Sequence, residues 1–98
     1  MQIAIAREVS PAIAKCELTY LERVPIHYET ACSEHGQYLA ALRSLGLQVQ
    51  VLPANPDLPD SVFVEDTAIV LDECAVITRP GAESRRPETE PAAAVLGR

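Results

Sequence analysis

The sequence predicts a small α/β fold, on the strength of three observations. Two short apolar runs, at residues 2–6 and 47–52, flank an amphipathic stretch at 28–45. Two further runs rich in valine and isoleucine, at 68–71 and 74–78, are separated by only a polar pair. A strand–helix–strand unit followed by a hairpin is typical of α/β proteins. The 98 residues allow one small domain.

The charge and hydropathy of the chain exclude several classes of partner. A net charge of −6 and an isoelectric point near 4.7 argue against nucleic acid and against an anionic membrane surface. No apolar run approaches the ~18 residues of a membrane span. The first apolar run is too short for a signal peptide, because Arg7 and Glu8 end it.

The cysteines and histidines predict neither a disulfide framework nor a metal site. There are three cysteines, Cys16, Cys32 and Cys74, and their spacing matches no zinc pattern. We expect reduced thiols in a cytoplasmic protein and interpret each as a small apolar filler. Cys32 and His35 share a helical face, but no further ligand group lies nearby, so we expect His35 to be half-buried and His27 to be exposed. No metal and no cofactor is predicted.

The first strand is expected at residues 2–6, where Ile3 and Ile5 lie on one face. Its apolar character suits a strand in the interior of a sheet. Residues 12–26 mix apolar and charged types with no clean period, which predicts a long loop. Such a loop is either part of a functional site or a plain surface connection, and the residues alone leave both interpretations open.

Residues 28–45 are the clearest helix, because their apolar positions follow the i, i+3/i+4, i+7 rule. Glu29 in the first turn and Arg43 in the last complement the helix dipole. Gly46 supplies a C-terminal stop. The N-cap is poor, because His27 stands where a serine, threonine or aspartate would be better.

Residues 47–52 alternate between apolar and polar types, as a half-buried strand does. A strand, a helix and a second strand form a crossover unit, which favours parallel pairing with residues 2–6 and a right-handed connection. Three prolines make residues 53–59 a stiff loop that ends at Asp60.

The hairpin carries acids before its first strand and arginines after its second. Asp60, Glu65 and Asp66 come before residue 68, and Arg85 and Arg86 follow the Pro80-Gly81 turn. Both ends of a hairpin lie near one rim, so these groups are expected to face a shared hollow. A rim with separated acidic and basic groups suits a ligand that is charged at both ends, such as an amino acid with a cationic side chain.

The individual charges have more than one interpretation. Glu65 and Asp66 point to opposite faces on a regular strand, whereas a bend aims both at one site, and a solvated acidic turn is the structural alternative. A carboxylate accepts the N–H groups of a guanidinium in pairs, and Arg85 can clamp an α-carboxylate in the same way. Its alternative is a surface turn paired with nearby glutamates. We interpret Arg86 as structural and Phe63 as a core anchor.

The last part of the sequence predicts the opening of a second helix. Residues 87–91 place acids and prolines in a first turn, and three alanines follow. No further strand follows to complete another crossover unit.

The motifs PDSVFVED and ITRPGAESRR, together with IAIAR, ELTYLER and ALRSLGLQVQVLPA, resemble the dimethylarginine dimethylaminohydrolases (dimethylargininases). These enzymes belong to the guanidine-modifying superfamily of arginine deiminases and amidinotransferases. The resemblance covers nearly the whole chain, which has less than half the usual length. It implies a truncated α/β propeller (pentein) of pseudo-five-fold ββαβ modules. Residues 1–98 would be a partial amidinotransferase-like domain, supplying the first module and the start of the second.

The resemblance also implies an activity and a set of site residues. Such an enzyme hydrolyses dimethylarginine to citrulline and dimethylamine through a covalent thiouronium on a cysteine, with a histidine moving protons. Both catalytic groups are expected beyond Arg98, and no cofactor is implied. The resemblance places the backbone of Leu18 at the substrate's amino group, Asp66 at its guanidinium and Arg85 at its carboxylate. The positions that match substrate-binding residues are Leu18, Asp60, Glu65, Asp66 and Arg85.

Two other functions stay open. One is a non-catalytic α/β module that binds a cationic amino acid or a partner protein. The other is a fragment of an arginine deiminase or amidinotransferase relative. The expected partner is a small guanidine amino acid, with no nucleic acid and no membrane. Unpaired sheet edges would favour a homodimer.

Overall fold

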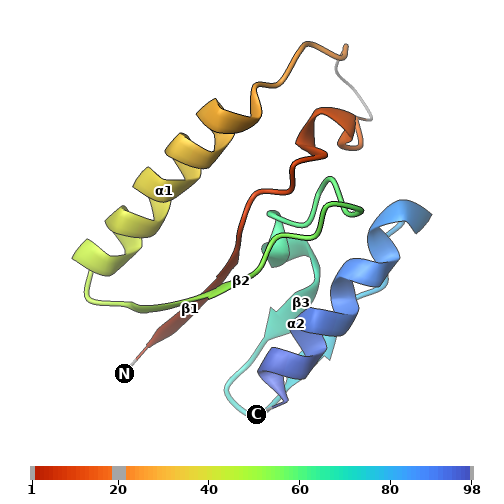
Figure 1. The fold of residues 1–98 in the computed structure, drawn as a ribbon. Coiled ribbons are helices and arrows are strands. Elements are labelled where there is room, and N and C mark those ends of the chain that lie inside the picture. The colour runs from red at the N-terminus through yellow and green to blue at the C-terminus, as the bar shows by residue number, and fades with distance from the viewer. Residues whose placement is uncertain (1, 19–21, 98) are drawn as a thin grey trace.

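The structure, a computed structural model, describes residues 2–18 and 22–97 (Figure 1). Each of the two helices accompanies a pair of strands, which confirms the predicted α/β class. No helix in the described part of the chain has the length and apolarity needed to cross a membrane. The strands and α-helices are β1 (Ile3–Arg7), α1 (Tyr28–Ser44), β2 (Gln48–Leu52), β3 (Ala68–Val70), β4 (Ala75–Ile77) and α2 (Thr89–Leu96). The 3₁₀ turns are η1 (Ile13–Lys15), η2 (Val64–Asp66) and η3 (Glu83–Glu88).

Strands β1 and β2 pair in parallel, from Ile3 opposite Gln48 to Arg7 opposite Leu52. The helix α1 connects them, so the predicted crossover unit is confirmed (Figure 1). The expectation that β1 lies inside a sheet is wrong for the residues that the structure describes. There β1 pairs with β2 only, and Ile3 is exposed.

Helix α1 ends as the sequence predicts. Gly46 follows with a φ of +87°, in the left-handed region that favours glycine, and its N–H donates to the carbonyl of Arg43 at 3.0 Å. At the other end, His27 makes no side-chain capping bond, so the poor N-cap is confirmed. His27 is exposed and His35 is half-buried, as expected.

A pair of glycine substitutions tests this account of α1. Gly46→Ala is expected to lower the free energy of unfolding by about 1 kcal/mol through backbone strain alone, since a Cβ there meets no atom. Gly36→Ala, inside the helix and equally open, is expected to raise it by roughly 0.5–1 kcal/mol. Urea denaturation of the two variants measures both changes. Equal and same-sign shifts would contradict the assignment of Gly46 as the helix stop.

The small core lies between the start of the chain and α1. Val9, Ile13 and Cys16 are buried there, and partly buried side chains of α1 and of residue Val62 pack against them. Hydrogen bonds hold the proline-rich loop to the same segment, since the Ser10 hydroxyl donates to the carbonyl of Asn55 at 2.7 Å. This core therefore fixes the position of the proline-rich loop, and with it the position at which the hairpin segment begins.

The hairpin of β3 and β4 is antiparallel, with Ala68 opposite Ile77, as predicted, although both strands are slightly shorter than expected. The hydroxyl of Thr78 donates to the carbonyl of Asp66 at 2.6 Å and closes its open end. Cys74 is exposed in the turn, so its interpretation as a buried filler is wrong. A hairpin turn faces solvent whatever residue it contains. The predicted second helix is present as η3 followed by α2.

Candidate functional site

The charged groups at the two ends of the hairpin meet in one hollow of about 450 Å³. Three of the predicted site residues line it, and they come from the loop before η2, from the end of η2 and from η3. The sequence therefore predicts correctly that Asp60, Asp66 and Arg85 converge, whereas Glu65 lies outside this hollow. The lining residues are Glu17, Asp60, Phe63, Asp66, Pro80, Gly81, Ala82 and Arg85.

Arg85 is held by a buried partner that lies outside the hollow. Its Nε donates to Oε2 of Glu88 at 3.1 Å, and its Nη2 donates to Oε1 of the same carboxylate at 2.8 Å. Glu88 is only 2% exposed, so this two-point ion pair is shielded from water. Nη2 also contacts the carbonyl oxygens of Phe63 and Asp60, at 3.1 and 3.3 Å.

These contacts decide how Arg85 can meet a ligand. Its Nε–Nη2 edge already binds Glu88, so a ligand carboxylate has access to Nη1 only. The sequence offers several glutamates as partners for the arginines. In the structure Arg85 pairs with Glu88, and Arg86 pairs with Glu83. The hydrogen bond to Glu88 and the weaker one to Asp66 raise the pKa of Arg85 above its usual value, against the opposing effect of burial. The guanidinium is therefore cationic at every pH at which the chain is folded.

Asp66 provides the exposed carboxylate of the hollow. Its Oδ2 accepts from Nη1 of Arg85 at 2.8 Å, and its side chain is 54% exposed. The carboxylate therefore combines a fixed cationic neighbour with access to solvent. The hydrogen bond from Arg85 uses Oδ2, which leaves Oδ1 as an acceptor for a planar cationic donor.

Asp60 is a buried acid that organises the loop opposite the hairpin. It is 5% exposed, and its two carboxylate oxygens accept the backbone N–H of Glu17 at 3.0 and 3.3 Å. This contact joins positions that lie 43 residues apart. Asp60 thus places the backbone of residues 17–18 at the edge of the hollow.

The structure does not bring the other two predicted residues into this hollow. Leu18 follows Glu17 and is exposed, and its side chain does not line the hollow. Glu65 instead lines a separate cavity of about 330 Å³ beside Ile3 and Tyr38. Because η2 turns the backbone, Glu65 and Asp66 point to different sides, which is the first of the two alternatives left open by the sequence.

Sequence reasoning missed Glu17 as part of this site, considered Glu88 only as one of the glutamates that could pair with the arginines on the surface, and misplaced Phe63. Glu17 belongs to the long loop, whose mixture of residue types shows no periodicity. The length of the loop was compatible with a functional site, but it singled out no residue. Phe63 is 41% exposed and lines the hollow, so its interpretation as a core anchor is wrong. The backbone carbonyl of Phe63 is committed to Arg85, which holds the residue at the rim instead of in the core.

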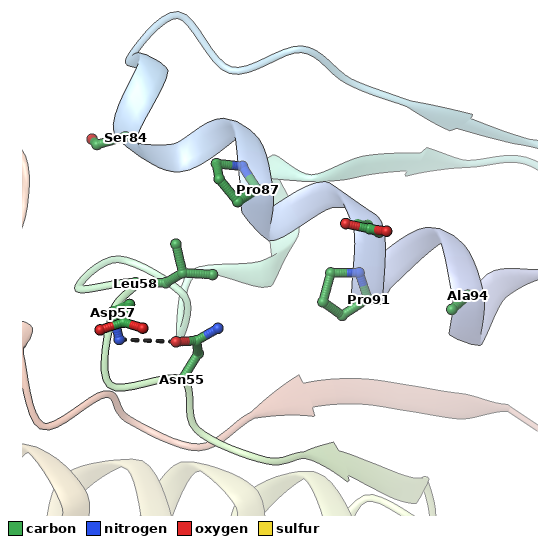
Figure 2. A pocket seen from close by; sticks show the side chains of 8 residues that line it. Asn55, Asp57, Leu58, Ser84, Pro87, Pro91 and Ala94 are labelled. Atoms are coloured by element: carbon green, nitrogen blue, oxygen red, sulfur yellow. Dashed lines mark hydrogen bonds between the residues drawn. The ribbon is translucent and has the colours of Figure 1, made fainter.

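A larger hollow of about 660 Å³ lies between the proline-rich loop and α2 (Figure 2). Pro87 and Pro91 line one side, and Leu58 and Asn55 face them. The dashed line in Figure 2 marks the bond from the N–H of Asp57 to Oδ1 of Asn55, at 2.8 Å. Its charged lining residues are acids only, so it lacks the pairing of opposite charges that distinguishes the smaller hollow.

The hollow with Asp66 and Arg85 carries no nucleophilic thiol and no imidazole among its lining residues. Of the three cysteines, Cys16 is buried in the core and Cys74 lies in the hairpin turn. Within the described residues, no three histidine, cysteine or acidic side chains are placed to hold a metal ion. The arrangement can therefore bind and orient a charged ligand.

Comparison with known proteins gives a consistent result. The family model for "N,N dimethylarginine dimethylhydrolase, eukaryotic" matches residues 13–96. A dimethylarginine dimethylaminohydrolase of Pseudomonas aeruginosa is 49% identical over 63 residues, which are 64% of this chain and 25% of the relative. The same-named protein of Streptomyces coelicolor is 42% identical over 97 residues, covering 96% of this chain and 38% of the relative.

Solved structures resemble the fold closely. A cysteine-to-serine mutant of the Pseudomonas aeruginosa protein, complexed with citrulline, matches with a TM-score of 0.90 and 38% identity. A histidine-to-glycine mutant in an adduct with S-methyl-L-thiocitrulline matches with a TM-score of 0.91 and 38% identity. Each match covers 97% of this chain and 37% of the other. The chain therefore spans about a quarter to two fifths of the length of its relatives.

Proposed function

Because this chain belongs to the dimethylarginine dimethylaminohydrolase family, we propose that it provides part of the substrate site of a hydrolase acting on guanidines. The substrate would be an arginine methylated on its guanidinium, and the products citrulline and dimethylamine. The meeting of Asp66 and Arg85 at 2.8 Å in one hollow is the observation that carries this proposal. The hollow brings carboxylates and a guanidinium into one lining, which suits a ligand that carries both cationic and anionic groups.

The roles of the individual residues are proposed from the family resemblance, and the contacts described above agree with them. Asp66 would bind the guanidinium mainly through Oδ1, because Oδ2 already accepts from Nη1 of Arg85. Arg85 would reach the α-carboxylate through Nη1, and the backbone at Leu18 would contact the amino group. Asp60 would act by holding that backbone in place. Glu65 is proposed as a substrate-site residue on family grounds, since its own cavity lies to the other side of η2.

The charge of the hollow supports a cationic ligand. Glu88 already compensates Arg85, while Glu17, Asp60 and Asp66 add three further carboxylates to the same lining. A ligand with two cationic groups relieves this surplus of negative charge. The hydrolysis itself needs a nucleophile and a general base, and the lining residues include no thiol and no imidazole for these roles. In this proposal the 98 residues position the substrate, and the catalytic cysteine and histidine belong to other parts of the enzyme.

Two alternatives remain as proposals of lower rank. The hollow supports equally well a non-catalytic module that binds a cationic amino acid or a partner protein. The family membership gives this alternative no support. An arginine deiminase or amidinotransferase relative would use the same charges on another guanidine. The methylated substrate is preferred because the family model and the named relatives agree on dimethylarginine.

The domain and its setting are proposed on the same grounds. Residues 1–98 would form the first module and the start of the second in an α/β propeller. The free cysteines support a cytoplasmic setting. Exposed aliphatic side chains on the hairpin, such as Ile69 and Val76, support a homodimer.

Ligand titration of the chain tests the proposed function. Heteronuclear NMR spectra recorded with dimethylarginine are expected to show shifts at the hollow. Asp66→Asn, which keeps the size of the side chain, is expected to weaken binding by roughly tenfold through loss of one charge-assisted contact. Asp72→Asn, an exposed acid in the hairpin turn, is the matched control and should bind as the wild type does. Wild-type spectra that do not respond to any guanidine would overturn the proposal.

A further inference from the structure

Glu17 is fixed at the edge of the hollow from two sides. Its backbone N–H donates to both carboxylate oxygens of the buried Asp60, at 3.0 and 3.3 Å. Its side-chain Oε1 accepts from the hydroxyl of Ser84 at 2.5 Å, a contact that spans 67 positions in the sequence. Arg23 steadies the preceding turn by donating to the carbonyl of Cys16 at 2.6 Å. The carboxylate is therefore held in place, although it lies on a loop.

The distribution of charge gives this carboxylate a distinct role. Arg85 is compensated by Glu88, and both oxygens of Asp60 face the backbone of Glu17. Asp66 and Glu17 are then the two acids of the hollow that are exposed to an entering ligand. A guanidine amino acid carries two cations, and the planar guanidinium suits Asp66. Its second cation, the compact α-ammonium, has three N–H groups, of which the backbone at Leu18 would take one, so a carboxylate can bind another.

We propose that Glu17 is a further substrate-binding residue, whose carboxylate binds the α-ammonium group of the guanidine amino acid. The inference rests on the proposed function of the hollow and adds a residue that determines specificity. The oxygen Oε2, which does not accept from Ser84, receives an ammonium N–H. Ser84 is a positioning residue, because it fixes the carboxylate through Oε1. The site thereby selects ligands with an amino group over guanidines that lack one.

The test compares two ligands that differ in the amino group alone. Arginine and desamino-arginine are titrated separately into the 98-residue chain and followed by heteronuclear NMR. Glu17→Gln keeps the shape of the side chain and an oxygen for Ser84, so the fold is preserved. It is expected to raise the dissociation constant for arginine about three- to tenfold, as loss of one charge-assisted contact does. For desamino-arginine the change is expected to stay below about twofold, because no cation meets Glu17 in that complex.

Two further variants complete the experiment. Glu22→Gln removes a nearby exposed acid and is expected to leave both affinities unchanged. Ser84→Ala is expected to weaken arginine binding by less than Glu17→Gln does, since the carboxylate keeps its charge and loses only its fixed orientation. An equal loss for both ligands in Glu17→Gln would overturn the role of Glu17 and leave the proposed function standing. A wild-type chain that binds neither ligand would overturn both.

Discussion

Replacing Arg85 with methionine is expected to lower the free energy of unfolding by about 2–3 kcal/mol. The substitution removes the cation that compensates Glu88, which is 2% exposed and would be left as a buried charge. Breaking one side of a buried ion pair typically costs about 3–5 kcal/mol, and water reaching the partly exposed Arg85 places this pair at the lower end. The backbone carbonyls of Phe63 and Asp60 lose a donor as well.

Urea denaturation followed by circular dichroism measures this change. Arg85→Met combined with Glu88→Gln is expected to recover part of the loss, because the second substitution removes the buried charge. Arg86→Met is the control, since Arg86 pairs with Glu83 on the surface and should cost less than about 1 kcal/mol. Similar losses for the two arginines would contradict the special status of the pair between Arg85 and Glu88.

Ile13→Ala is expected to lower the free energy of unfolding by about 2–3 kcal/mol. Ile13 is 6% exposed and belongs to a cluster whose other buried members, in the part of the chain that the structure describes, are Val9 and Cys16, so little remains to replace its contacts. The value lies at the lower end of the range for such truncations because an open hollow of about 380 Å³ already adjoins this side chain. The loop that carries Glu17 starts from the same turn, through the bond from the N–H of Cys16 to the carbonyl of Ile13 at 3.0 Å. Ligand binding should therefore weaken together with stability.

Ile69→Ala provides the comparison for this prediction. Ile69 lies on β3 and is 56% exposed, so its truncation removes little buried area and should cost less than about 1 kcal/mol. Thermal and urea denaturation of both variants distinguish the two positions. A loss at Ile69 as large as that at Ile13 would mean that the hairpin face is covered in solution, as a homodimer would cover it.

Sequence periodicity was sufficient to predict the elements of this fold. The amphipathic spacing in 28–45 and the left-handed position at Gly46 identified α1 and its end, because helix formation depends on contacts within a few residues. The hairpin and the parallel crossover followed from the same local patterns and from the handedness of strand–helix–strand connections. The convergence of Asp66 and Arg85 also followed, since the two ends of an antiparallel hairpin must lie together.

The partners of each charge were decided by tertiary structure. Several glutamates lie near Arg85 in the sequence, and only the burial of Glu88, the last residue of η3, selects one of them. The 3₁₀ turn separates Glu65 from Asp66, although a strand or a bend would have been equally compatible with the residues. Glu17 reaches the hollow because Asp60 binds its backbone across 43 positions. Local patterns determine helices and strands, whereas the environment of a charged side chain depends on which distant segments exclude water from it.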